Sequence, residues 1–260
     1  MRTILPLIIA IVGKGGVGKT VITTLMAKAI IQNYNYKLLL IDADPTHPHL
    51  SKMVKSVPQK SLEQVRLEII EKTLNKEKSI ETLAENIDFE VYSAISETKD
   101  FSLFSIGQPE GPGCFCPSNA LLKKVIESIS KDFEIVLIDC EAGLEQINRM
   151  VIEKIDILLI VVDVSLRSVE TALSIKKSAS KFTKYQNLGI IINKARGDIS
   201  IITNKLSNLE LPILAKVPDD ELIRQFDLEG KAIIDLSSNS SIFKEIVELI
   251  KIILSRSSNI

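Results

Sequence analysis

The sequence has few cysteines, histidines and aromatic residues and no tryptophan: three cysteines, two histidines and 5% aromatics among 260 residues. An odd set of three cysteines is too small for a disulfide framework, which argues against a small secreted scaffold. No apolar run reaches the roughly 20 residues of a membrane-spanning helix. The apolar start, Met1–Val12, has one basic residue and no small-residue cleavage site, which is typical of a buried strand rather than a signal peptide. These absences favour a cytoplasmic protein.

The sequence also lacks an excess of charge of either sign, with 32 basic residues against 33 acidic ones and a formal net charge of -1. No global positive field is present to attract nucleic acid or an anionic membrane, so we expect neither partner. Hydrophobic residues make up 45% and charged residues 25%, as in a globular protein with a sizeable core. The length suits one large α/β domain covering residues 1–260.

Short apolar runs alternate with helical patterns along most of the chain. The runs are continuous in Ile, Leu and Val, which is typical of strands covered on both faces. They are Ile4–Val12, Lys37–Ile41, Ile135–Ile138, Ile157–Val162, Leu188–Ile192 and Ile213–Val217. The helical patterns are Thr20–Gln32, Ser118–Ser130, Ser168–Phe182 and Ile242–Leu254. This order predicts an α/β fold with a doubly wound, mostly parallel sheet and helices on both faces.

The stretch at about 51–117 fits this alternation less well. It contains one helical pattern, Leu62–Leu74, and one possible strand, Phe89–Ala94. A loop rich in glycine and proline, Gly107–Gly113, follows. We interpret the stretch as an insertion into the single domain rather than as a second domain.

The strongest motif is the octapeptide Gly13-Lys14-Gly15-Gly16-Val17-Gly18-Lys19-Thr20, which has the G-x-x-x-x-G-K-T spacing of a phosphate-binding loop. It follows a predicted strand and opens a predicted helix, as this motif requires, which favours it over an ordinary glycine turn. Its backbone N–H groups and the helix N-terminus attract phosphates. Lys19 reaches the β- and γ-phosphates, and the Thr20 hydroxyl coordinates magnesium. The predicted contacts to ATP come from Gly13, Gly15, Gly16, Val17, Gly18, Lys19, Thr20 and Val21.

Three carboxylates follow predicted strands. Asp42 and Asp44 come after the run Lys37–Ile41, and Asp139 ends the run that starts at Ile135. Ligands of open α/β sheets bind at the carboxyl ends of strands, so these side chains are candidates for the magnesium site. A single such Asp is often only a helix cap, but three behind a phosphate-binding loop indicate a metal–nucleotide site.

Lys14 is not needed by a phosphate-binding loop, and with it the sequence resembles the deviant Walker A family. That family includes the MinD- and ParA-like partition ATPases, the nitrogenase iron protein and metal-insertion ATPases. The resemblance implies that Lys14 crosses a dimer interface to the partner's nucleotide, and hence an ATP-bound homodimer. A second cation there would offset charge on the leaving group. A solvated lysine is the alternative. Val21 departs from the family, which often has a threonine at this position.

The same resemblance assigns roles to further residues. It implies that Asp44 positions the attacking water and that Asp42 and Asp139 support the magnesium shell. Gly143, after the second aspartate strand, would present its N–H to the γ-phosphate, and Asn193 would contact adenine. Pro218 and Asp219 resemble the family's second loop on the base side. For Asn193 the alternative is a turn-forming asparagine.

Two of the cysteines, Cys114 and Cys116, are close enough to bind one metal ion. They provide two thiolates, whereas a closed tetrahedral zinc site needs four ligands. A two-fold homodimer supplies the other pair, and Lys14 independently calls for such a dimer. We therefore predict Zn²⁺ or Ni²⁺ at this pair, with two small unligated thiols as the alternative. An iron–sulfur cluster is chemically possible but is normally held by cysteines from two separated loops.

The segments Gly113–Leu122 and Glu141–Gln146 resemble the carbon monoxide dehydrogenase nickel-insertion ATPase family. That resemblance implies an accessory ATPase whose client is a nickel–iron enzyme such as carbon monoxide dehydrogenase. Gln146 stands where the family commonly has histidine, which leaves the client undetermined. Alternatives are an iron–sulfur redox ATPase like the nitrogenase iron protein and a MinD- or ParA-like positioning switch.

The two histidines and the third cysteine have simpler interpretations. His47 and His49 flank a proline just after Asp44. We favour their interpretation as polar loop residues over the alternative that they form a pair of metal ligands. Cys140 follows Asp139 at the end of a predicted buried strand. A small hydrophobic role is expected for it.

Overall fold

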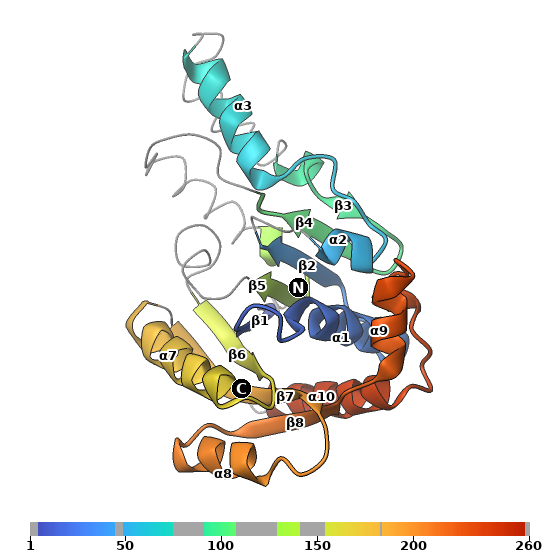
Figure 1. The fold of residues 1–260 in the computed structure, drawn as a ribbon. Coiled ribbons are helices and arrows are strands. Elements are labelled where there is room, and N and C mark those ends of the chain that lie inside the picture. Colours follow the sequence, from blue (N-terminus) through green and yellow to red (C-terminus); the bar gives the residue numbers. More distant parts are fainter. Residues whose placement is uncertain are drawn as a thin grey trace.

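The computed structural model describes residues 5–44, 49–74, 91–107, 129–140, 154–182 and 184–257. Within them lies one eight-stranded sheet in the order β3-β4-β2-β5-β1-β6-β7-β8 (Figure 1). The strands are β1 (Leu7–Gly13), β2 (Leu38–Ala43), β3 (Ser96–Glu97), β4 (Ser102–Ser105), β5 (Ile135–Cys140), β6 (Lys154–Val162), β7 (Lys184–Ala195) and β8 (Ile213–Pro218). Neighbouring strands are parallel except β3 and β4, which are antiparallel.

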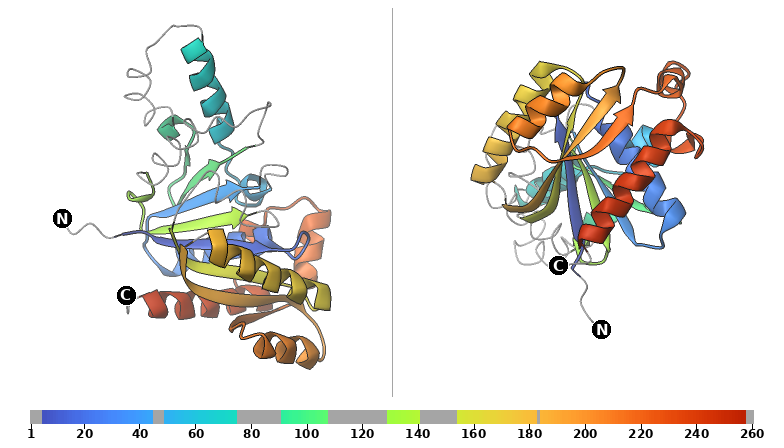
Figure 2. Two further views of the ribbon diagram at one scale, coloured as in Figure 1. Left: turned by 90° about the vertical axis from the view of Figure 1, so that its left-hand side faces the viewer. Right: turned by 90° about the horizontal axis from the view of Figure 1, so that it is seen from below.

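Helices cover both faces of this sheet, as Figure 2 shows. They are α1 (Lys19–Asn33), α2 (Leu50–Met53), α3 (Leu62–Leu74), α7 (Leu166–Phe182), α8 (Ser200–Asn208), α9 (Glu221–Leu228) and α10 (Ser241–Ser257), with a 3₁₀ turn η1 at Ile233–Asp235. One hydrophobic core joins the sheet to α3, α7 and α8, and a second joins it to α1, α2 and α10. The predicted doubly wound α/β architecture is confirmed.

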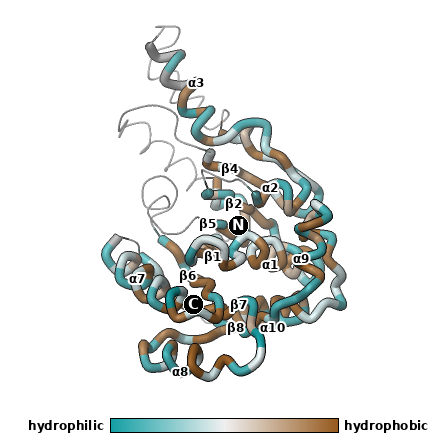
Figure 3. The backbone as a smooth tube through the Cα atoms, in the orientation of Figure 1, coloured by the Kyte–Doolittle hydropathy of each residue, from teal (hydrophilic) through white to brown (hydrophobic). Residues whose placement is uncertain are grey.

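The continuous apolar runs exist because successive residues of each strand enter different cores. In β1, Ala10 and Val12 pack in the core with α7, while Ile9 and Ile11 pack in the core with α1. All four are fully buried. Helices α8, α9 and α10 are one-sided instead: the tube in Figure 3 alternates between hydrophilic and hydrophobic stretches along them. Within the described residues no helix combines the length and the apolar character that a membrane span needs.

The six predicted strands and four of the predicted helices are confirmed, with boundary shifts of a few residues. The first strand begins at Leu7 rather than Ile4, and Leu5 is 71% exposed. The predicted helix Ser118–Ser130 lies outside the described residues except for its last two, which are helical. The possible strand at Phe89–Ala94 is wrong in its described part, because residues 91–93 form a helical turn.

Part of the stretch at 51–117 belongs to the main sheet. Strand β4 pairs with β2 in parallel, and β3 pairs with β4 to form the sheet edge. Strand β4 could not be predicted from the apolar pattern, because its four residues include Ser102 and Ser105, which are buried polar residues that interrupt that pattern. The boundaries of the single domain and of its insertion stay a prediction.

Strand β1 lies near the middle of the sheet, between β5 and β6. Strands β2 to β5 lie on one side of it and strands β6 to β8 on the other, so the chain connections run in opposite directions from this point. Crevices at such switch points are where open α/β sheets bind ligands. The loop Gly13–Thr20 starts at this point.

Candidate nucleotide-binding site

The loop between β1 and α1 needs glycine for its backbone path. Gly16 and Gly18 have φ of 79° and 92°, in the left-handed region that side chains disfavour. A Cβ on Gly18 would also lie 2.5 Å from Nδ2 of Asn193, which is too close. These glycines let the chain turn sharply before α1 starts at Lys19, so the first N–H groups of the helix face the crevice.

Gly13 has an even stricter requirement, and its replacement gives a first prediction. A Cβ there would lie 2.3 Å from the backbone oxygen of Val161 in β6, and φ is 152°. We expect Gly13→Ala to lower the free energy of unfolding of the ligand-free protein by about 3 kcal/mol, because the clash is with backbone that cannot rotate away. Urea unfolding measures this loss.

Gly15→Ala is the matched control for Gly13→Ala. No heavy atom lies within 4 Å of a Cβ built on Gly15, and its φ is outside the left-handed region. We expect its unfolding free energy to stay within about 0.5 kcal/mol of wild type. Equal losses in the two variants would contradict the packing of β1 against β6 described above.

A cavity of about 710 Å³ opens beside this loop and joins segments that are far apart in the sequence. Its lining includes most residues predicted to contact the nucleotide: Gly15, Gly16, Gly18, Lys19, Thr20, Val21, Asp44, Asn193, Pro218 and Asp219. Such a volume is typical of a ligand pocket. Of the other predicted contacts, Gly13 and Val17 are buried behind the loop. Gly143 lies outside the described residues.

Asp42 and Asp139 are adjacent at the carboxyl ends of β2 and β5, where they form a register pair. Both are buried, with exposures of 0% and 2%. The Thr23 hydroxyl donates to Oδ1 of Asp139 at 3.2 Å, and the Thr20 hydroxyl bonds to the same carboxyl. The Asp44 N–H donates to Oδ1 of Asp42 at 3.2 Å. The predicted magnesium ligands Thr20, Asp42 and Asp139 are therefore together.

Asp42 and Asp139 are buried side by side, and the pKa of each carboxyl group is raised. Burial, with the Asp139 charge second, raises the pKa of Asp42 to about 8, and Oδ2 of Asp42 has no hydrogen-bond partner. Burial likewise raises the pKa of Asp139 to about 6, against the hydrogen bonds from Thr20 and Thr23. A cation would neutralise both carboxylates and would give the orphaned oxygen a partner. An all-oxygen donor set of this kind fits magnesium.

The side chain of Lys19 contacts the backbone of Lys14, but the two lysines differ in their relation to the cavity. Nζ of Lys19 donates to the Lys14 carbonyl at 3.3 Å and lines the cavity. The Lys14 side chain does not line the cavity and is half-buried. In this arrangement Lys19 can contact a phosphate in its own site, whereas Lys14 is not part of that cavity.

The far side of the cavity combines apolar and charged residues of the C-terminal third. Ile223 and Phe226 of α9, Ile233 of η1 and Ile242 of α10 provide the apolar wall that a flat base requires. The buried amine of Lys28 donates to the carbonyls of Ile234, at 2.8 Å, and Leu236. These bonds fasten η1 to α1, the helix that begins at the phosphate-binding loop.

Asp219, a predicted base-side residue, is held by two arginines. Arg196 forms an ion pair with its Oδ2, and Arg224 of α9 approaches the same oxygen at 3.5 Å. The Asp219 N–H also donates to the Ala195 carbonyl at 3.2 Å. Sequence reasoning missed Arg196, Arg224 and the whole of α9. The eight-residue amphipathic pattern Glu221–Leu228 was the signal that could have found the helix.

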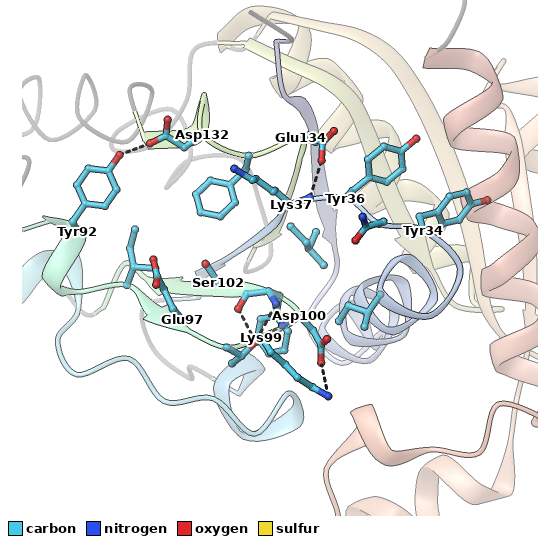
Figure 4. Close-up of a pocket in the computed structure, with 17 residues that line it drawn as sticks. Tyr34, Tyr36, Lys37, Tyr92, Glu97, Lys99, Asp100, Ser102, Asp132 and Glu134 are labelled. Carbon is cyan, nitrogen blue, oxygen red and sulfur yellow. Dashed lines mark hydrogen bonds and ion pairs between the residues drawn. The ribbon is translucent and has the colours of Figure 1, made fainter. Parts of the chain in front are cut away.

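A second cavity, of about 770 Å³, lies at the opposite edge of the sheet, near the amino ends of β2, β4 and β5 (Figure 4). The rings of Tyr34 and Tyr36 stack there with centroids 5.8 Å apart. The Tyr92 hydroxyl donates to Asp132 across it. This cavity contains no residue of the phosphate-binding loop, so it is separate from the candidate nucleotide site.

The predicted thiol metal site cannot be placed. Cys114, Cys116 and His47 lie outside the described residues. Among the residues that are described, no group of three or more His, Cys, Asp or Glu side chains is arranged to hold a metal ion. Cys140 is 2% exposed, and burial raises the pKa of its thiol, as expected of a small hydrophobic residue. His49 is exposed at the mouth of the nucleotide cavity.

Comparison with known proteins matches this architecture to a family. Residues 8–233 match the family model described as "CobQ/CobB/MinD/ParA nucleotide binding domain". The matched range contains the phosphate-binding loop, all three carboxylates and the base-side residues.

Similar proteins extend over nearly the whole chain. An uncharacterized ATP-binding protein of Methanocaldococcus jannaschii is 33% identical over 255 residues, which is 96% of this chain and 99% of the relative. The carbon monoxide dehydrogenase accessory protein CooC of Rhodospirillum rubrum is 32% identical over 248 residues, covering 88% and 90%. The crystal structure of the cell division ATPase MinD from Pyrococcus furiosus superposes with a TM-score of 0.69 at 25% identity, covering 96% and 99%.

Proposed function

The chain belongs to the CobQ/CobB/MinD/ParA nucleotide-binding family, and we propose that it is a homodimeric ATPase that serves metal insertion into a nickel–iron enzyme such as carbon monoxide dehydrogenase. The observation that carries this proposal is the likeness to CooC over 90% of that protein's length, together with a complete phosphate-binding loop beside a cavity of nucleotide size. The pair Cys114 and Cys116 supplies the thiolates that such a role requires.

We assign the steps of ATP hydrolysis to three groups of described residues in and beside the cavity. Lys19 binds the terminal phosphates, and Thr20, Asp42 and Asp139 hold magnesium, whose charge, when bound, stabilises the phosphate oxygens. Asp44 orients the attacking water. Because the Asp44 N–H donates to the Asp42 carboxylate, the water-orienting residue is tied to a metal ligand. Asn193, Pro218 and Asp219 border the adenine.

The homodimer follows from Lys14. Its ammonium does not line the cavity of its own chain, although six of the next seven residues do. In a face-to-face dimer it would reach the partner's nucleotide, where a cation offsets charge on the leaving oxygens. The same two-fold axis would place four thiolates, two from each chain, around one Zn²⁺ or Ni²⁺ ion.

Metal content tests the accessory role. We expect anaerobically purified dimer to bind about one Zn²⁺ or Ni²⁺ through four thiolates, and the double variant Cys114→Ala/Cys116→Ala to bind none above background. Cys140→Ala is the matched control, because it removes a buried thiol that the proposal does not use. Atomic emission spectroscopy on each purified protein gives the metal per dimer.

Three results would count against nickel or zinc insertion. Unchanged metal in the double variant would exclude the cysteine pair as ligands. A brown protein with iron and sulfide would indicate a redox ATPase with a shared cluster, since zinc is colourless. Salt-sensitive DNA binding by a metal-free protein would indicate a positioning switch of the partition type.

A further inference from the structure

We infer that Asn193 and Lys194 clamp the phosphate-binding loop from β7, and that Lys194 is a positioning residue for the β- and γ-phosphates. The inference rests on the proposed nucleotide binding and adds a residue to which neither the sequence motifs nor the comparisons give a role. Two hydrogen bonds carry it: Nδ2 of Asn193 donates to the Val17 carbonyl at 2.7 Å, and Nζ of Lys194 donates to the Gly16 carbonyl at 2.9 Å.

These contacts join segments separated by 176 and 178 residues in the chain. Strand β6 lies between β1 and β7, so the clamp has to pass the end of β6. The pairing of β6 with β7 stops at Val162 and Ile192, whereas β7 continues to Ala195. The overhang of β7 therefore places Asn193 and Lys194 beyond β6 and level with the loop.

The backbone of β7 is irregular at the clamp itself. Between the pairs Ile192–Lys216 and Ala195–Pro218, β7 advances three residues while β8 advances two, which is a β-bulge. Lys194 sits in the extra stretch with φ of 56°, a left-handed conformation that costs a non-glycine residue about 1 kcal/mol or more. Bulges re-aim side chains, and here the bulge directs the Lys194 amine to Gly16.

The clamp fixes the direction of two N–H groups in the phosphate-binding loop. In a planar trans peptide the C=O and the following N–H point in opposite directions. Holding the carbonyls of Gly16 and Val17 toward β7 therefore turns the N–H groups of Val17 and Gly18 away from β7. A charged donor on the Gly16 carbonyl also polarises that peptide and strengthens its N–H as a donor.

The Gly16 peptide is linked onward to Lys19. The Val17 N–H donates to the Lys14 carbonyl at 3.4 Å, and the same carbonyl accepts from Nζ of Lys19 at 3.3 Å. Lys194 thus stands at one end of a chain of contacts whose other end is the predicted phosphate-binding amine. Removing the Lys194 amine should loosen the loop without touching the base side of the cavity.

Nucleotide affinities of Lys194→Met test this inference. We expect the Kd for ADP with magnesium to rise about tenfold, which corresponds to about 1.4 kcal/mol, while the Kd for AMP changes less than about twofold. AMP shares the base, the ribose and the α-phosphate of ADP but lacks the β-phosphate that Lys194 is inferred to help position. Lys194→Arg, which keeps a charged donor, should recover at least part of the ADP affinity. Competition against a fluorescent ADP analogue measures all three constants.

Lys216→Met is the matched control, since Lys216 is an exposed lysine on the neighbouring strand β8 that does not line the cavity. Its ADP affinity should equal that of wild type. Equal ADP affinity in Lys194→Met and wild type would overturn the clamp, and so would a loss that is the same for AMP and ADP. A wild-type protein that binds neither nucleotide would instead refute the proposed function, so the two failures are distinguishable.

Discussion

Replacing Lys14 with glutamine is expected to lower kcat for ATP hydrolysis by about a hundredfold and to leave the Kd for ATP within about threefold of wild type. The reason is that Lys14 lies outside the cavity of its own chain, whereas Lys19 lines it. Lys19→Gln should instead weaken ATP binding itself. Steady-state phosphate release and equilibrium titration with ATP separate the two effects.

Mixing two inactive variants tests whether Lys14 acts on the partner's nucleotide. Asp44 borders the cavity of its own chain, so Asp44→Asn should inactivate that site alone. A mixed dimer of Lys14→Gln with Asp44→Asn keeps one complete site, in which Asp44 comes from one chain and Lys14 from the other. Random mixing makes half of the dimers mixed, so about a quarter of wild-type activity should return.

Two results would contradict a role for Lys14 across the interface. Activity that stays absent after subunit exchange would place Lys14 in its own site or exclude the dimer. Lost ATP binding in Lys14→Gln alone would do the same. A mixture of Lys14→Gln with Lys14→Met is the control and should stay inactive.

Asp42→Asn is expected to make the ligand-free protein more stable than wild type and the nucleotide-bound protein less stable than wild type. The pKa of Asp42 is raised from 3.8 to about 8, so the folded chain holds a proton there that the unfolded chain releases above pH 4. The contribution of Asp42 to the free energy of unfolding therefore falls as the pH rises from about 4 to about 8. At pH 8 the neutral amide should raise the unfolding free energy by at most about 5 kcal/mol.

The same variant should lose the stabilisation that Mg²⁺ and ATP give to the wild type, because Asp42 is a proposed magnesium ligand with an orphaned buried oxygen. Chemical unfolding at pH 5 and pH 8, with and without Mg²⁺ and ATP, gives four comparisons. The gain should be smaller at pH 5, where the folded wild-type carboxyl is neutral but the unfolded one is ionised, and it should vanish only below about pH 4. A variant that is less stable than wild type at pH 8 without ligand would contradict the buried-charge interpretation.

Features that depend on neighbouring residues could be read from the sequence. The spacing of Gly13, Gly18 and Lys19 sets a turn between a strand and a helix, and the structure has that turn. Continuous runs such as Ile135–Ile138 indicated strands buried on both faces, because each successive side chain must enter a different core. Asp42 and Asp139 ended such runs, so their meeting at one edge of a parallel sheet was predictable without knowing the strand order.

Contacts between distant segments were decided only by the tertiary structure. Lys194 reaches Gly16 because β6 ends short of β7 and because a bulge turns the Lys194 side chain, and no local pattern encodes either fact. The pairing of Asp219 with Arg196 likewise requires β7 and β8 to be neighbours. The sequence by itself determined which chemical groups are candidates to bind a phosphate, since those groups are set by residues close together in the chain. The strand order determined what holds them in place, because it alone brings residues more than a hundred positions apart within hydrogen-bonding distance.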